Sequence, residues 1–271
     1  VIQKNRALID AYELGSVLKP ILLSSAIDNN IFDPDIPIEI PRRLKINDKI
    51  ISDYKSYEEL TPKQVIAYSS QVGASKIAIM LGYEKLKDAY YNFGFGKPIS
   101  INFPSSAFGL MNIKDKISDK ELASLGYGYG LTISPFQITS AYSVFANKGI
   151  YKDFKILKTD EVGLKRVISE DSAKHTLEAL KEVVHIGTGK NADINGYTEG
   201  GKTGTVHKTS YGNGYAEDSY RASFVGIAPL SDKSLTIFVS IDEPGLNAYS
   251  GGMIHSCLLY TSDAADDGLS V

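Results

Sequence analysis

The chain has 271 residues, of which 43% are hydrophobic and 23% are charged, a composition typical of a globular protein with one large or two small domains. Its 29 basic and 32 acidic side chains leave a net charge of −3, so no basic face and no nucleic-acid partner are expected. The four histidines are scattered, which argues against a multi-histidine metal site, and no cofactor is predicted. No apolar run reaches the ~18 residues of a membrane-spanning helix.

The first predicted helix follows Gly15-Ser16, where an apolar run over residues 21–27 begins and Pro20 falls in the first turn. Ser16 is therefore expected at a helix N-terminus, where unpaired backbone amides favour developing negative charge. Residues 28–60 combine several prolines with short alternating runs, and this pattern predicts an irregular excursion.

The middle of the chain reads as helical and the last third as strands. Capping signals open helices at Thr61, Ser118 and Ser134, and further helices are predicted over residues 72–81, 84–92 and 169–186. Residues 203–208, 221–229 and 234–242 predict three antiparallel strands. Helices followed by consecutive strands indicate an α+β fold, an antiparallel sheet flanked by helices.

A serine and a lysine one helical turn apart, Ser16 and Lys19, form the first candidate catalytic element. A serine hydroxyl attacks a carbonyl only when a base takes its proton, and a buried lysine acquires the lowered pKa that such a base needs. The alternative for Ser16 is a plain helix N-cap. The same spacing recurs at Ser52 and Lys55, but there it lies in a charged segment without a helix start, so Ser16 is preferred.

The second element is Ser69-Ser70-Gln71, between two predicted helices. Its hydroxyl could relay a proton, although capping of a helix end is the alternative role. A competing match to Ser-x-Asn lies at residues 100–102, in a loop-like stretch.

The third element, Lys202-Thr203-Gly204-Thr205, can supply a cation and backbone donors for a carboxylate and an oxyanion. Residues 196–203 also fit the phosphate-binding loop G-x-x-x-x-G-K-[ST], which must follow a buried strand and open a helix. The polar residues before it and the strand-forming residues after it disfavour nucleotide binding, which is kept as a remote alternative.

The three elements together resemble the motif set of class B penicillin-binding proteins, and the resemblance covers residues 1–256. Segments between the motifs look most like the division-specific septal transpeptidase. They are residues 125–131, 134–137 and 241–244 with Gly251-Gly252. The resemblance implies the penicillin-binding-protein fold and serine acyl transfer. Gln71 departs from the family's asparagine and is one methylene longer.

The resemblance implies that Ser16 is the nucleophile, Lys19 its base and Ser69 a proton relay, with Lys202 completing the catalytic set. The implied substrate-binding residues are Gln71, Thr203, Gly204 and Thr205. Backbone amides of Ser16 and Thr205 would form the oxyanion hole. The implied reaction cross-links peptidoglycan stem peptides ending in D-Ala-D-Ala, with β-lactams as mimics. A serine β-lactamase and a non-catalytic β-lactam sensor or division scaffold remain alternatives.

Family resemblance also implies action at the periplasmic face of the bacterial inner membrane, with membrane-bound cell-division proteins as partners. Family elements before Val1, including the anchor, and the closing C-terminal helix of the family are expected to lie outside this chain. Residues 257–271 resemble a translated sequencing adapter and are expected to be a non-native tail. The single cysteine, Cys257, lies in this tail, and one cysteine alone cannot form an internal disulfide.

Overall fold

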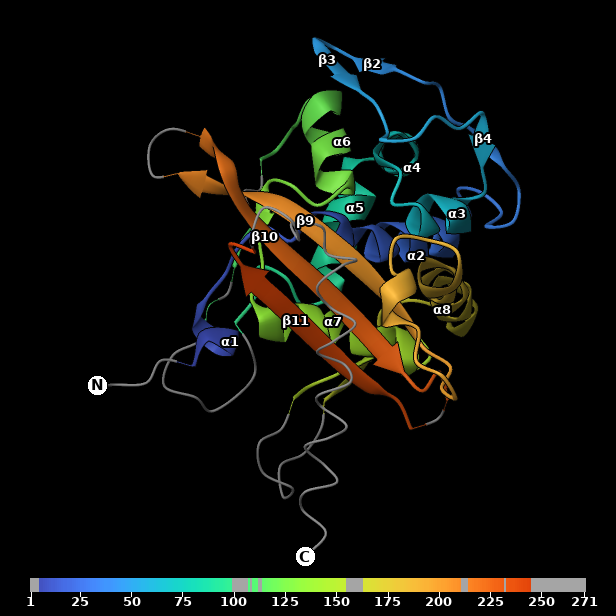
Figure 1. Cartoon of the computed structure of the whole chain (residues 1–271), viewed down its shortest axis with the longest axis vertical. Helices are drawn as coiled ribbons and strands as arrows, with labels where there is room; N and C mark the ends of the chain where they lie inside the picture. Colours follow the sequence, from blue (N-terminus) through green and yellow to red (C-terminus); the bar gives the residue numbers. More distant parts are fainter. Residues whose placement is uncertain are drawn as a thin grey trace, which may run out of the picture.

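The computed structural model describes residues 5–98, 107, 109–111, 114–154, 163–210, 214–231 and 233–244, and it leaves undescribed the side chains of residues 209–218. The helices form one group, and a twisted three-stranded sheet from the end of the described chain packs against it (Figure 1). Among the described residues, no helix is both long enough and apolar enough to cross a bilayer.

The sheet is built from the three predicted strands at the end of the described chain. They are β9 (Gly200–Ser210), β10 (Gly214–Ala228) and β11 (Leu235–Asp242). All pairings are antiparallel and the order is β11-β10-β9, with Thr203 opposite Phe224 and Val225 opposite Phe238. Among the described strands, β9 pairs with β10 alone. Its second edge therefore has no strand partner among the described residues.

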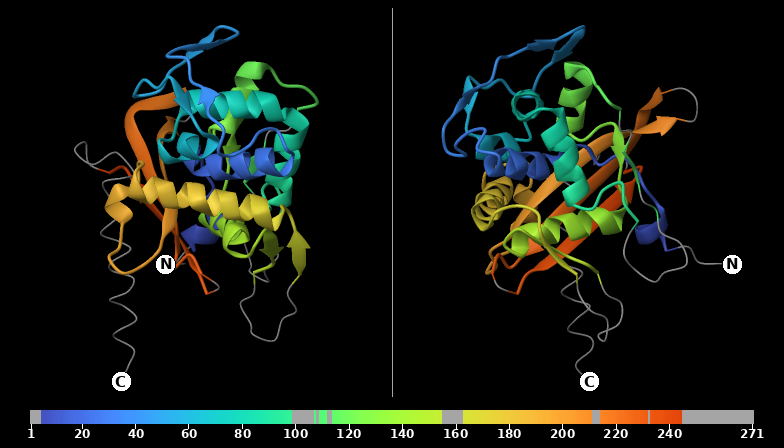
Figure 2. Two further views of the ribbon diagram at one scale, coloured as in Figure 1. Left: turned by 90° about the vertical axis from the view of Figure 1, so that its right-hand side faces the viewer. Right: turned by 180° about the vertical axis from the view of Figure 1, so that it is seen from behind.

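The helices lie on one face of this sheet, as the two views in Figure 2 show. In chain order they are α1 (Arg6–Ile9), the 3₁₀ turn η1 (Gly15–Leu18), α2 (Lys19–Asp28), α3 (Pro62–Ala67), α4 (Gln71–Leu81), α5 (Tyr83–Asn92), α6 (Asp119–Gly126), α7 (Pro135–Ala146), α8 (Glu170–His185) and the 3₁₀ turn η2 (Lys190–Ala192). The capping boxes predicted at Thr61, Ser118 and Ser134 are confirmed, because each side chain accepts from the third helical N–H.

Helix α2 is the centre of the core. All of its residues from Lys19 to Ile27 are buried, so it has no polar face, as expected for a helix enclosed on every side. Its apolar side chains join one large cluster with residues of α4, α7 and the sheet. A rigid, fully enclosed helix thus carries Lys19 at its first position.

The predicted excursion over residues 28–60 consists of short strand pairs. These are β1 (Ile38–Glu39) with β4 (Glu59–Leu60), and β2 (Leu44–Ile46) with β3 (Lys49–Ile51). Similar two-stranded pairs occur further along the chain: β5 (Leu110–Met111) with β6 (Leu131–Thr132), and β7 (Ile150–Lys152) with β8 (Leu164–Arg166).

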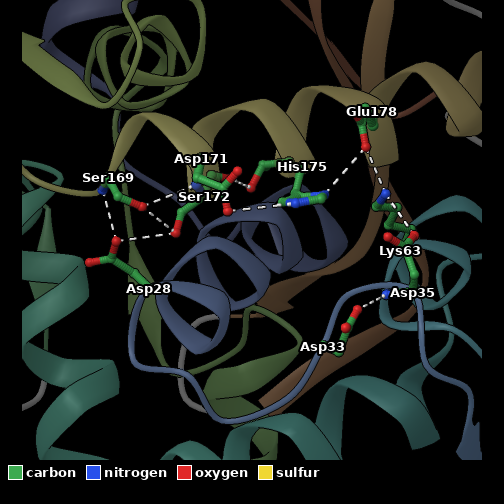
Figure 3. Close-up of polar contacts among 10 residues, drawn as sticks. Asp28, Asp33, Asp35, Lys63, Ser169, Asp171, Ser172, His175 and Glu178 are labelled. Atoms are coloured by element: carbon green, nitrogen blue, oxygen red, sulfur yellow. Dashed lines mark hydrogen bonds and ion pairs between the residues drawn. The ribbon is translucent and has the colours of Figure 1, made fainter.

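Polar contacts fasten α8 to the N-terminal half of the chain (Figure 3). The Asp28 carboxylate, at the end of α2, accepts from the Ser169 N–H at 2.7 Å, at the start of α8. The ammonium of Lys63, on α3, pairs with Asp35 at 2.8 Å and with Glu178 on α8 at 2.6 Å. These contacts fix the position from which the chain leaves α8 toward β9.

Candidate active site

The first element forms a tight turn that leads into α2. Gly15–Leu18 is a 3₁₀ turn and the α-helix begins at Lys19, so the expectation that Ser16 itself opens the α-helix was wrong by three residues. The three-residue spacing of Ser16 and Lys19 still places the two residues on the same side of the turn, because positions three apart eclipse in a 3₁₀ turn. Ser16 is half-buried and Lys19 fully buried.

Two hydrogen bonds hold this turn in place. The Tyr142 hydroxyl on α7 donates to the Val17 carbonyl at 2.6 Å, and the Gly15 N–H donates to the Gly128 carbonyl at 3.2 Å. Gly15 has φ +57°, and a Cβ at Gly128 would lie 1.9 Å from the Gly15 oxygen. Glycine is therefore required on both sides of this contact.

The second element lies at the predicted junction of two helices. Ser69 has φ +59°, a left-handed conformation that is uncommon for a residue other than glycine, and it turns the chain between α3 and α4. Asp53 holds the start of α4: it accepts from the Ser70 hydroxyl at 2.5 Å and from the N–H groups of Gln71 and Val72 at 2.6 and 3.2 Å. The turn that presents Ser69 is thus locked by a distant carboxylate.

The third element lies on β9, directly against the first. A Cβ at Gly204 would come within 2.6 Å of the Leu14 carbonyl and 2.7 Å of Val17. Only glycine permits this approach of β9 to the Ser16 turn. Lys202 is fully buried, Thr203 is buried and Thr205 is exposed.

The two lysines and Ser69 meet in one hydrogen-bonded cluster. The Lys19 Nζ lies 2.5 Å from the Ser69 carbonyl oxygen and 3.3 Å from its Oγ. The Lys202 Nζ lies 3.0 Å from the same Oγ and 3.1 Å from the Thr203 carbonyl. Residues from three distant segments therefore converge on one hydroxyl, next to the turn that carries Ser16.

Burial sets the electrostatics of this cluster. It lowers the pKa of the Lys19 amine to about 7, against a smaller opposing effect of the Asp53 carboxylate. It lowers the pKa of Lys202 well below the ordinary lysine value, and the charge of nearby Lys19 adds to the effect. Two amines with lowered pKa values that share one hydroxyl suit the acceptance and return of a proton.

A groove of about 760 Å³ adjoins the cluster at Ser69. Its walls come from the segment after β3, from the α3–α4 junction and from the segment after α8. The lining residues are Ser52, Asp53, Tyr54, Lys55, Tyr57, Tyr68, Ser69, Gln71, Ile186, Gly187, Thr188 and Lys190. Gln71 is exposed in this wall, and its backbone N–H is bound to Asp53.

Two of the competing sequence matches lack the geometry that their motifs require, and a third lies outside the described residues. The chain after Lys202 continues as strand β9, not as a helix, so the phosphate-binding loop hypothesis is wrong. Ser52 and Lys55 lie outside any helix or 3₁₀ turn, which leaves their spacing without the geometry of Ser16 and Lys19. Residues 100–102 lie outside the described residues, as do Gly251, Gly252 and the tail that contains Cys257.

Sequence reasoning missed two residues that shape the site. Asp53 was passed over because it lies inside the rejected Ser52–Lys55 copy, yet it anchors the second element. Thr188, just after α8, forms a hydrogen bond between its Oγ1 and that of Thr203 at 2.7 Å, and its N–H donates to the Ala67 carbonyl at 3.1 Å. Neither carries a sequence signal, because each acts through a partner more than ten positions away.

No group of three or more metal-ligating side chains gathers anywhere in the described part of the chain. The site is a cluster of serine and lysine side chains between the helices and the antiparallel sheet, and the family comparisons agree with that chemistry. The model of the penicillin-binding protein transpeptidase domain matches residues 2–258. The chain belongs to this family.

Curated relatives of the chain are named as peptidoglycan D,D-transpeptidases. The chain is 35% identical to the probable peptidoglycan D,D-transpeptidase PbpC of Pseudomonas aeruginosa over 254 residues, which is 93% of this chain and 45% of the relative. It is 33% identical to the peptidoglycan D,D-transpeptidase FtsI of Escherichia coli, covering 93% of this chain and 43% of the relative. The chain thus spans about half the length of the curated relatives it matches.

Solved structures give the same fold. The apo transpeptidase domain of penicillin-binding protein 3 from Burkholderia pseudomallei superposes with a TM-score of 0.87 at 34% identity, covering 97% of this chain and 82% of that one. Penicillin-binding protein 3 from Mycobacterium tuberculosis in complex with aztreonam gives a TM-score of 0.85 at 27% identity, covering 96% and 64%. The predicted fold class, an antiparallel sheet flanked by helices, is confirmed.

Proposed function

We propose that this chain is the catalytic part of a peptidoglycan D,D-transpeptidase that cross-links stem peptides through an acyl-enzyme on Ser16. The observation that carries the proposal is the meeting of Lys19 and Lys202 on the Ser69 hydroxyl beside the Ser16 turn. Names of the relatives, all peptidoglycan D,D-transpeptidases, support the substrate class.

In the proposed acylation, the Ser16 Oγ attacks the carbonyl carbon of the penultimate D-Ala and its proton passes to the neutral Lys19 amine. The C–N bond then breaks, and the proton travels through Ser69 to the leaving amine of the terminal D-Ala. Backbone N–H groups of Ser16 and Thr205 hold the oxyanion, and each donor contributes roughly 3 kcal/mol to transition-state stabilisation in comparable enzymes.

The third element and Gln71 bind the substrate in this proposal. The terminal carboxylate lies on Lys202, Thr203 and Thr205, and its negative charge draws a proton back onto the Lys202 amine. Strand β9 has β10 as its one partner among the described strands, and its other edge would offer backbone groups to an extended peptide, in the manner of an added strand. Gln71 donates its side-chain amide to a substrate carbonyl.

A β-lactamase would need a base for rapid hydrolysis of the acyl-enzyme. Asp53 is a carboxylate in the groove that adjoins Ser69, and its two oxygens accept from the Ser70 hydroxyl and from the N–H groups of Gln71 and Val72. A carboxylate committed in this way is a poor base for water. This favours slow deacylation, and therefore a β-lactam target over a β-lactam hydrolase.

The cellular setting belongs to the same proposal. Similarity to FtsI supports a role in septal wall synthesis at the periplasmic face of the inner membrane, with membrane-bound division proteins as partners of the whole protein. A purely sensory domain would acylate without cross-linking, so incubation with a lipid-linked substrate distinguishes the two by the presence or absence of dimeric muropeptide.

The test of the nucleophile is the intact mass after penicillin treatment. We expect a single stable adduct on the parent and on Ser52→Ala, the matched control for the second Ser-x-x-Lys copy, and no adduct on Ser16→Ala. An adduct that persists on Ser16→Ala and disappears on Ser52→Ala would overturn the assignment.

A further inference from the structure

A patch of positive charge lies at the start of the β2–β3 hairpin, on Arg42, Arg43 and Lys45 (the hairpin patch). All three residues are exposed, and within the described part of the chain no hydrogen bond or ion pair engages their side chains. The chain as a whole carries a net charge of −3, so three neighbouring cations without a carboxylate partner run against its overall balance. A concentration of unpaired charge of this kind attracts an anionic ligand.

The inner side of the hairpin is fixed to the core and to α6. Ile46 is buried in the main hydrophobic cluster. The Lys49 Nζ donates to the Tyr127 hydroxyl, at the end of α6, at 2.6 Å. At the turn between the strands, the Asp48 carboxylate accepts from the Lys120 Nζ at 2.8 Å. Because these contacts hold the hairpin from one side, a ligand meets a preformed surface on the other and loses little free energy in ordering it.

The outer face of the hairpin combines charge with an apolar side chain. Lys45 on β2 lies directly opposite Ile50 on β3, and opposite residues of an antiparallel pair share one face. Ile50 is 58% exposed, although isoleucine is among the residues most often buried. Figure 1 shows the hairpin projecting beyond the helices at the top of the view. The face therefore suits a ligand that carries both carboxylates and apolar groups, rather than a simple inorganic anion.

The edges of the hairpin favour an extended peptide as this ligand. Each of its strands pairs only with the other among the described strands. Residues 44–51 make no backbone hydrogen bond to any other part of the described chain. In an antiparallel pair, backbone N–H and C=O groups along the outer edges point away from the partner strand, and an added strand binds them. A lipid headgroup would pair with the cations but would leave these backbone groups and Ile50 unused.

We propose that the β2–β3 hairpin is a docking site for an acidic, extended segment of a partner protein. The segment lies along one edge of the hairpin as an added strand. Its carboxylates pair with the hairpin patch, and an apolar side chain of the segment covers Ile50. No residue of the hairpin patch lines the groove at Ser69, so docking here is separate from the reaction at Ser16 and does not depend on the proposed function.

The binding probes are fluorescently labelled peptides of about ten residues, the length of a long strand. The acidic probe alternates glutamate with valine, so every carboxylate falls on one side of an extended chain. A second peptide has glutamine in place of glutamate. Two more keep the glutamates but carry N-methyl groups, on every glutamate in one and on every valine in the other, so each loses the N–H groups along one edge. Vesicles of phosphatidylglycerol test the lipid alternative.

The protein variants remove equal charge at two places on the whole chain. Arg42→Gln/Arg43→Gln/Lys45→Gln neutralises the hairpin patch. The matched control neutralises three exposed lysines on α5 and α8, as Lys85→Gln/Lys174→Gln/Lys181→Gln. Fluorescence anisotropy measures peptide affinity, co-sedimentation measures vesicle binding, and circular dichroism shows that each variant is folded.

We expect the parent and the control variant to bind the acidic peptide equally, and the hairpin-patch variant to bind it about tenfold more weakly. That difference should shrink as the salt concentration rises. The glutamine peptide and one of the two methylated peptides should bind more weakly, while the other methylated peptide should keep its affinity. Equal affinities of the hairpin-patch variant and the control would overturn the docking site, as would equal binding of the two methylated peptides. Binding of the parent to vesicles but not to the acidic peptide would also overturn it, in favour of an anionic membrane surface.

Discussion

Lys63 and Lys19 are both buried lysines on helices that face the core, but their surroundings give them opposite properties. Burial alone would lower the pKa of Lys63, but hydrogen bonds to Asp35 and Glu178 outweigh it and raise the pKa above the ordinary lysine value. Lys19 is more deeply buried and bonds to the neutral Ser69, so its pKa falls to about 7. Burial therefore makes a lysine into a base only where no carboxylate pairs with it directly.

The largest effect is expected at Lys19, the lysine without a directly paired carboxylate. Lys19→Met keeps a long side chain in the core but removes the amine that accepts the Ser16 proton in the proposed mechanism. We expect the second-order rate of acylation by penicillin to fall about 10³-fold, within the range of general-base contributions. Stopped-flow fluorescence with a reporter penicillin measures it, and a variant within tenfold of the parent would assign the base to another group.

The pH dependence of the acylation rate is the next test. Because the pKa of Lys19 is lowered to about 7, the amine is neutral above that pH and protonated below it. The acylation rate should therefore fall about tenfold for each pH unit below 7 and level off above it. A flat profile between pH 5 and pH 8 would show that the rate does not depend on this proton. Circular dichroism at each pH controls for unfolding.

A smaller effect is expected at Thr188. Thr188→Val removes the hydroxyl that bonds to Thr203 while keeping the side-chain shape. Loss of one such hydrogen bond corresponds to about 1 kcal/mol, or roughly fivefold in the acylation rate. Thr188→Ser should restore the rate, because it retains the hydroxyl. Identical kinetics for the valine and serine variants would mean that this contact does not position the third element.

The smallest effect on the acylation rate is expected at Lys63, the lysine that is paired with Asp35 and Glu178. Lys63→Met removes the bridge between α3 and α8 but touches no group of the cleft. The penicillin acylation rate should stay within twofold of the parent. The free energy of unfolding should fall by about 1 kcal/mol, which lowers Tm by about 3 °C, because Asp35 and Glu178 are both substantially exposed. A calorimetric scan beside the kinetics separates the two outcomes.

The sequence predicted local features well and long-range contacts poorly. Capping boxes at Thr61 and Ser134 and the three final strands could be placed because their signals lie within a few residues. The roles of Asp53 and Thr188 could not, because each depends on how distant segments pack.

The start of α2 shows the same limit on a smaller scale. Whether a turn is 3₁₀ or α depends on the contacts made by Gly15 and Val17, which tertiary packing decides. Gln71 is another example: its departure from asparagine is visible in the sequence, whereas its exposure in the groove wall comes from the fold.

The close approach of Gly204 to Leu14 has a consequence for biosynthesis. The α2 segment is synthesised well before β9, the strand that completes its surroundings. Until β9 docks, Lys202 has no place beside Ser69 and the Lys19 amine remains open to water, where its pKa is that of an ordinary lysine. The buried surroundings that lower the pKa of Lys19 are therefore complete only after the last hairpin has folded.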